Sequence, residues 1–141
     1  MWYFKGKPYL EIHNPDLVGF IYLITFTDPK TKNELKYIGK KQFFNKRTKK
    51  KGKRELAAMT DKRGSKKVVN VKESDWKNYQ SSNTILKVQD PKDLKKEILD
   101  FCDSLSCLTY KETKLQFVHE VLENDEWLNG NILRRFFSIK K

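Results

Sequence analysis

The stretch GFIYLITFTDPKTKNELKYIGKK, residues 19 to 41, decides the fold. Residues 17–27 are rich in β-branched and aromatic side chains, which is typical of a buried strand. Residues 28–34 have the composition of a turn, and residues 35–38 form a second short apolar run. The pattern predicts an antiparallel hairpin that carries Tyr22 and Tyr37. These tyrosines are either ordinary core residues or members of a chemical site.

The rest of the chain gives weaker structural signals. Residues 1–13 could add an edge strand, and residues 68–76 favour a strand. Ser81 and Ser82 can cap a short helix that runs to residue 89. Residues 90–102 are ambiguous, because Asp90 and Pro91 signal a helix start while KEILDFC suits a strand.

Residues 108–124 have the clearest helical pattern, with a stripe that consists of Leu108, Leu115, Val118 and Leu122. After a turn, residues 132–137 predict a last strand or a short helix. The chain has no internal repeat and no linker, and 141 residues suit one domain. We therefore expect a single domain over residues 1–141, with an N-terminal extension over residues 1–16.

The positive charge is concentrated in one segment. The chain has a formal net charge of +12, and residues 40–67 hold 13 Lys or Arg against two acids. Such a segment is either a solvated loop or an arm that binds the phosphates of nucleic acid in a salt-dependent way. Gly52 and Gly64 predict turns within it. The expected DNA-binding residues are Lys40, Lys41, Lys46, Lys49, Lys50, Lys51, Lys53, Arg54 and Arg63.

Several classes of protein are excluded at this level. The start of the chain lacks the pattern of a signal peptide, and no apolar run approaches the roughly 20 residues that span a bilayer. Cys102 and Cys107 are too few for a disulfide framework, and no Cys and His spacing fits a zinc site. We expect a cytoplasmic protein that has no membrane partner.

The quoted hairpin resembles the GIY-YIG nuclease family. GFIY and YIG stand at residues 19–22 and 37–39, and Arg47 follows eight residues after Gly39. Glu112 stands in TYKETKLQF, and KESDWKNYQSS and WLNG complete a likeness to the small single-domain, homing-type endonucleases of tailed phages. The resemblance covers residues 19–135. It implies an α/β (α+β) fold, in which a three-stranded antiparallel sheet is flanked by helices and a basic arm is inserted after the second motif.

The resemblance also implies a chemistry. The chain would be a phage-encoded, homing-like or restriction-like endonuclease that cuts double-stranded DNA as a monomer or weak homodimer. Glu112 would bind Mg²⁺ or Mn²⁺, and one carboxylate suffices for a cation that keeps most of its water. Arg47 would contact a phosphate oxygen. Tyr22, with its pKa lowered, would accept a proton from water, and Tyr37 would orient the water or the phosphate.

Three features depart from the family pattern, and the first is that the turn between the two motifs is longer than usual. Lys51 stands where many relatives carry His or Tyr, and the basic insertion after Arg47 predicts that the usual helix there is short. The family often ends in a site asparagine, and Asn129 and Asn131 are both candidates. His119 has a structural or DNA-facing interpretation. The alternative function is a non-catalytic, basic nucleic-acid-binding module on the same scaffold.

Overall fold

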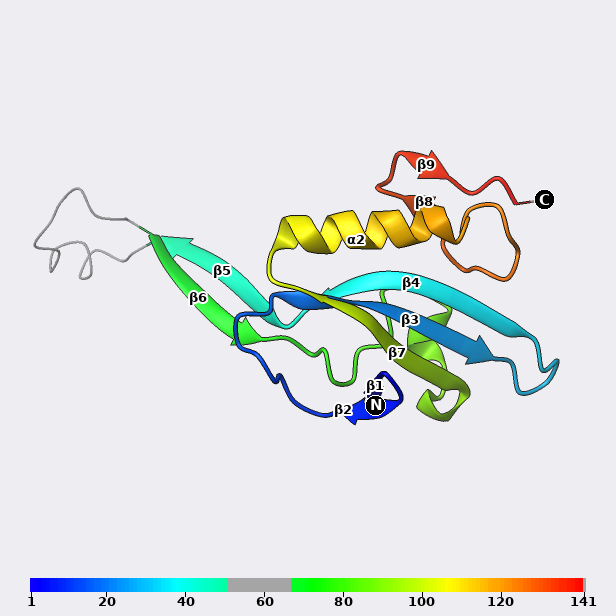
Figure 1. Cartoon of the computed structure of the whole chain (residues 1–141), viewed down its shortest axis with the longest axis horizontal. Coiled ribbons are helices and arrows are strands. Elements are labelled where there is room, and N and C mark those ends of the chain that lie inside the picture. Colours follow the sequence, from blue (N-terminus) through cyan, green and yellow to red (C-terminus); the bar gives the residue numbers. More distant parts are fainter. Residues whose placement is uncertain (51–66, 141) are drawn as a thin grey trace, which may run out of the picture. The chain divides into compact units, whose positions relative to one another are not determined.

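A computed structural model describes residues 1–50 and 67–140, with side chains described except those of residues 47–50 and 67–69. The chain divides into two units (Figure 1). The first comprises residues 1–43 and 75–141, and the second comprises residues 44–74. The pocket that holds the candidate site is built from the first unit.

The first unit is organised around a five-stranded sheet of order β2-β1-β7-β3-β4. The strands are β1 (Trp2–Phe4), β2 (Lys7–Tyr9), β3 (Gly19–Thr27), β4 (Glu34–Gln42) and β7 (Leu94–Cys102). The antiparallel trio β7-β3-β4 is the three-stranded sheet implied by the resemblance. The N-terminal segment enlarges it, since β1 pairs in parallel with β7 and β2 pairs with β1. The mixed α/β class is confirmed.

The predicted hairpin is confirmed and is longer than expected. Asp28 closes its turn, because the side chain accepts from the Lys30 N–H (2.8 Å) and the backbone pairs with Asn33 (2.9 Å). The ambiguous segment 90–102 resolves into a 3₁₀ turn η2 (Pro91–Asp93), which Asp90 caps, followed by β7. β7 is a strand because it has β3 on one side and β1 on the other, and both neighbours satisfy its backbone.

Helix α2 (Leu105–Val118) covers one face of the sheet (Figure 1). Ser104 caps its start by accepting from the Cys107 N–H (3.0 Å). The helix ends six residues earlier than predicted, because Glu120 takes a positive φ of 52° and the Val121 N–H bonds back to the Gln116 carbonyl. Of the predicted stripe, Leu108 and Leu122 are buried but Val118 is exposed, so its inclusion was wrong.

An aromatic core fills the opposite face of the sheet. It consists of Trp2, Tyr9, Phe20, Tyr22, Phe43 and Trp76, all nearly inaccessible to solvent. Most of their rings contact one another edge-on or tilted, as in Trp2 against Phe20 (5.0 Å between centroids), while Tyr9 and Phe43 are stacked. Trp2 also donates a hydrogen bond to the Trp76 carbonyl (2.6 Å). The N-terminal strands of the sheet and the segment after residue 75 therefore contribute side chains to a second core on this face.

The segment between β6 and β7 differs from its prediction. Ser81 and Ser82 do not start an α-helix; Ser81 is buried with a positive φ of 81°, and the only helical turn before η2 is the 3₁₀ turn η1 (Leu86–Val88) among the described residues. The Ser81 hydroxyl accepts from the Asn83 N–H (3.1 Å). A residue with positive φ cannot continue a right-handed helix, so the chain forms a compact loop here.

The second unit is a hairpin of β5 (Phe44–Lys50) and β6 (Lys67–Glu73), with Arg47 opposite Asn70. The strand after the basic segment is confirmed, whereas a short helix at Arg47 was wrong, because this residue lies on a strand. The turns predicted at Gly52 and Gly64 lie outside the described residues.

None of the helices in the described part of the chain combines the length and the apolar character that crossing a membrane requires. The two cysteines are free thiols whose sulfur atoms lie 3.1 Å apart.

Candidate functional site

The site lies at the outer edge of β4. The backbone of Lys36, Ile38 and Lys40 faces outward there, because alternate residues of an edge strand have no partner strand. Lys36 bonds to the backbone of Glu126 (2.8 Å) and Leu128 (2.7 Å). Further along, side chains bond to the backbone of this edge: those of Asn129 and Gln116 to Ile38, and that of Glu112 to Lys40. The polar pocket is located where this covered edge ends.

That pocket has a volume of about 340 Å³. Its lining is mostly polar and comprises Tyr37, Lys40, Glu112, Gln116, Asn129, Gly130, Asn131, Leu133 and Arg134. Tyr37, Lys40 and Glu112 come from the predicted site and basic arm, and both candidate asparagines line the pocket as well. Three segments far apart in sequence therefore supply one concave, charged surface.

Glu112 is held against the strand edge by helix geometry. It lies one turn from Leu108 and one turn from Gln116, both buried, so all three share the face of α2 toward the sheet. Burial raises the pKa of Glu112, while the Lys40 charge and a backbone hydrogen bond from Lys40 oppose that rise. A half-buried carboxylate in such a pocket favours a cation as its partner.

The two tyrosines meet over Gly39. In the register of the hairpin, Tyr22 is opposite Gly39 and Tyr37 is opposite Ile24. The rings of Tyr22 and Tyr37 are stacked with centroids 6.2 Å apart. A Cβ atom on residue 39 would lie 2.4 Å from the Tyr22 hydroxyl and 3.0 Å from the Tyr37 ring. The glycine of the second motif therefore makes room for the phenol of the first.

The surroundings of the tyrosine hydroxyls come from the loop after Trp76. Ser81 and Tyr79 interact with the Tyr22 hydroxyl, and Ser82 and Ser81 interact with that of Tyr37. Burial raises the pKa of both phenols, that of Tyr22 well above its usual value, while the serine hydroxyls act in the opposite direction. The protein alone therefore holds both tyrosines neutral, and the lowered pKa expected for Tyr22 would need charge from outside these residues.

The two asparagines have different roles. Asn129 is buried, and its amide pairs with Ile38 by accepting from the N–H (3.2 Å) and donating to the carbonyl (2.9 Å). Gln116 donates to the same carbonyl (3.2 Å). Asn131 is exposed and accepts from the Arg134 N–H (3.0 Å). Asn129 thus joins the C-terminal segment to β4, while Asn131 supports the next turn.

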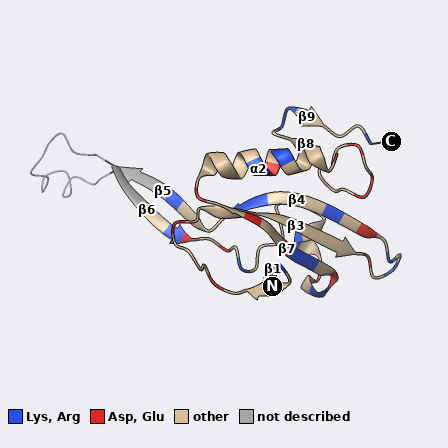
Figure 2. Cartoon of the chain, in the orientation of Figure 1, with Lys and Arg blue, Asp and Glu red and all other residues tan. Residues whose placement is uncertain are grey.

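The basic residues of the predicted arm form three groups: Lys40 and Lys41 lie on β4, Lys46 lies on β5, and the side chains of the others are outside the described part. Lys40 contacts Thr109 (2.8 Å), whereas Lys41 is paired with Asp75 (2.7 Å) and lies over the Tyr79 ring (4.0 Å), so Lys41 has a structural partner. Lys46 is exposed on β5. The side chains of Arg47, Lys49 and Lys50 lie outside the described part, as do the residues Lys51, Lys53, Arg54 and Arg63. Figure 2 shows further basic residues at the turn between β8 (Asn131–Ile132) and β9 (Phe136–Phe137).

Sequence reasoning missed Arg134, Gln116 and Ser81. Gln116 had a usable signal, since it lies one helical turn after Glu112 and shares its face. Arg134 and Ser81 had none, because their places depend on positive φ angles that their residue types rarely adopt. His119 is exposed at the end of α2, with its ring 5.4 Å from that of Trp127, which supports the structural interpretation.

The pocket residues fit a hard cation that keeps most of its water. The described residues contain no group of three or more His, Cys, Asp or Glu side chains that could enclose a metal ion. Glu112 is the carboxylate of the pocket, whereas the side-chain oxygens of Asn129 and Asn131 already accept from the N–H groups of Ile38 and Arg134. One carboxylate with water as the other oxygen donors is a donor set that Mg²⁺ accepts.

The fold agrees with a comparison to known families. The family model described as "Putative endonuclease segE, GIY-YIG domain" matches residues 2–132. The chain therefore belongs to the GIY-YIG family of the segE type, and its class is that of an endonuclease domain. Comparisons with curated proteins and with solved structures found no significant match.

Proposed function

We propose that this chain is a divalent-metal-dependent DNA endonuclease whose active site is the pocket at the edge of β4. The observation that supports this most directly is that Tyr37, Lys40 and Glu112 line one polar pocket although they come from β4 and α2. Glu112 would bind Mg²⁺ or Mn²⁺. The Glu112 carboxylate would attract the metal cation, and the cationic side chains of the pocket would attract the phosphodiester.

The protein residues divide the remaining work. Tyr37 contacts the pocket and would orient the attacking water or the phosphate. Tyr22, behind it, would accept the proton in its phenolate form, with Ser81 shared between the two hydroxyls. Arg47 would bind a nonbridging phosphate oxygen with its guanidinium fork. The cation, when bound, would neutralise charge on the phosphoryl and leaving oxygens.

The biological setting proposed is that of a phage-encoded enzyme with a homing-like or restriction-like role. Residues 1–141 would form one catalytic domain with the basic residues 40–67 as its DNA-binding arm. Phosphate contacts from this arm hold the duplex but read no sequence directly. The enzyme would act in the cytoplasm of the host, as a monomer or as a weak homodimer on DNA.

Plasmid cleavage tests the proposal. Wild type, Glu112→Gln and the control Glu123→Gln, which removes an exposed carboxylate outside the pocket, are compared in Mg²⁺, Mn²⁺ and EDTA. We expect cutting by wild type and control only with metal, and a loss of at least about a hundredfold in Glu112→Gln. Duplex binding by Glu112→Gln should be equal or tighter, because a carboxylate that repels phosphate has been removed.

Binding without cutting by wild type, in either metal and on several duplexes, would replace the enzyme with the non-catalytic binding module. If Glu112→Gln cut DNA at the wild-type rate, the metal would have to be held by other residues.

A further inference from the structure

A strained turn carries an arginine to the edge of the pocket. β8 and β9 are joined through a turn in which the Arg135 N–H bonds to the Ile132 carbonyl (3.1 Å). Its two central residues, Leu133 and Arg134, have positive φ angles of 56° and 55°. Turns of this kind prefer Gly, Asn or Asp at both positions, because a side chain at positive φ crowds its own backbone.

The strain is not explained by packing. Leu133 is 49% exposed and Arg134 is exposed as well, so burial of these side chains does not hold the turn. The turn is held by its own backbone bond and by Asn131, whose side-chain oxygen accepts from the Arg134 N–H. Strained residues that the local sequence disfavours are concentrated at functional sites.

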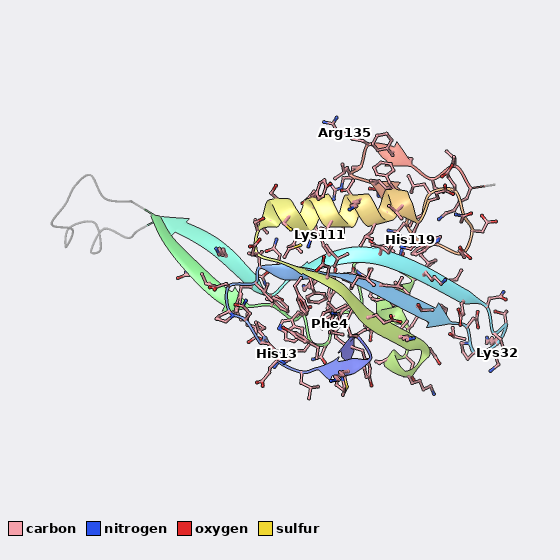
Figure 3. All side chains as sticks on the ribbon, in the orientation of Figure 1. Phe4, His13, Lys32, Lys111, His119 and Arg135 are labelled. Atoms are coloured by element: carbon pink, nitrogen blue, oxygen red, sulfur yellow. The ribbon has the colours of Figure 1, made fainter. Side chains whose placement is uncertain are left out.

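The position of Arg134 suggests which function the strain serves. Arg134 lines the same pocket as Tyr37, Lys40 and Glu112. It has no ion pair among the described residues, and Glu112 has no salt bridge there either. The neighbouring Arg135, which is labelled in Figure 3, lines a different, mostly apolar cavity according to its surrounding residues. The two arginines of the turn therefore face different surroundings.

The charges of the pocket favour a phosphate as the ligand of Arg134. Lys40 and Arg134 are two cations beside one carboxylate, and a cation bound at Glu112 would add positive charge. A guanidinium presents a planar fork of donors that matches two phosphate oxygens. A ligand whose anionic group is a carboxylate would be repelled by the Glu112 charge. A reacting phosphodiester would bind together with a cation at Glu112, and that cation would compensate this repulsion.

We infer that Arg134 is a further catalytic residue, which binds the scissile phosphate of the DNA opposite Glu112 and Lys40. This inference rests on the proposed function. It assigns to the strained turn the task of placing the guanidinium, and to Asn131 the task of supporting that turn. The phosphate oxygens gain negative charge as the water attacks, so the contact strengthens in the transition state.

Single-turnover cleavage of plasmid DNA with saturating protein tests the inference. We expect Arg134→Gln to slow cutting by about a hundredfold and Arg134→Lys by about tenfold, because lysine keeps the charge but loses the fork. Arg135→Gln makes the same charge change at the adjacent residue and should stay within about threefold of wild type. Duplex affinity, measured without metal, should differ little between Arg134→Gln and Arg135→Gln.

Arg134→Gly separates function from folding. Glycine accepts the positive φ, so the melting temperature should be unchanged or raised by about 2–4 °C while cutting is still lost. A wild-type cleavage rate in Arg134→Gln, or a loss that disappears at saturating protein, would overturn the inference and leave the proposed function intact. A wild-type protein that cuts no DNA would overturn both.

Discussion

The hydroxyl of Tyr22 lies directly over Gly39, where a Cβ atom would be 2.4 Å from the phenolic oxygen and 2.6 Å from the carbon that bears it. Tyr22 is 1% exposed and packs against Trp2 and Tyr79, so its ring has no free direction in which to move. The first tyrosine and the second glycine of the two motifs therefore constrain each other across the hairpin.

Gly39→Ala should displace Tyr22 and disturb both the core and the site. We expect the free energy of unfolding to fall by about 1–3 kcal/mol, because a methyl group is forced into a filled space. Urea unfolding measures this. Gly130→Ala is the matched control for stability, since nothing lies within 4 Å of a Cβ there. Equal stability of the two variants would contradict the close packing of Tyr22 on Gly39.

Cleavage should increase with pH across the neutral and alkaline range. Burial raises the pKa of Tyr22 well above that of free tyrosine, so the basic phenolate is a small fraction that grows about tenfold for each pH unit. A log-linear rise in the single-turnover rate between about pH 6.5 and about pH 9 is expected. Tyr22→Phe should lose both the rate and the slope. A plateau reached near neutral pH would assign the proton transfer to another group.

Lys96 should make stability depend on pH. It is 5% exposed, donates to the Tyr79 carbonyl (2.8 Å) and lies over the Trp2 ring (4.5 Å), and burial lowers its pKa to about 8. Between about pH 8 and about pH 10.5 the unfolded chain binds the proton and the folded chain does not. The stability that this group contributes therefore rises with pH in that window.

Urea unfolding of wild type and Lys96→Met at several pH values measures the effect. Wild type should gain on the order of 1–3 kcal/mol relative to the variant as the pH passes through this window. The difference between the two proteins matters, because the raised pKa of the Cys102 thiol acts in the opposite direction at alkaline pH. A difference that does not change with pH would show that Lys96 titrates alike in both states.

The two asparagines should differ in their effect on stability. Asn129→Ala leaves the buried N–H and carbonyl of Ile38 with fewer partners, which should cost about 2–3 kcal/mol. Asn131→Ala removes one exposed hydrogen bond from the Arg134 N–H and should cost under about 1 kcal/mol. It should also slow cleavage, because the turn that places Arg134 loses a support. Thermal unfolding and cleavage of both variants check this, and a reversed order in stability would contradict the assignment.

Local chemistry accounts for what could be predicted without the structure. The hairpin follows from β-branched residues on either side of a turn that Asp28 can close. The helix that carries Glu112, a residue singled out by the family resemblance, follows from its own periodicity. Each of these features depends on residues within a few positions of one another. Residues 90–102 show the limit of this reasoning, since Asp90 and Pro91 signal a helix start while KEILDFC suits a strand.

Tertiary structure decided everything that depends on contacts between distant segments. Residues 94–102 became the strand β7 because β1 and β3 satisfy its backbone on both sides. Asn129 became a partner of Ile38, 91 positions away, because the outward edge of β4 needed a donor and an acceptor there. Arg134 entered the pocket through backbone angles that its residue type disfavours. By itself, the sequence determined the hairpin and its tyrosines, while the pocket exists only because the helix and the C-terminal segment cover the same unpaired strand edge.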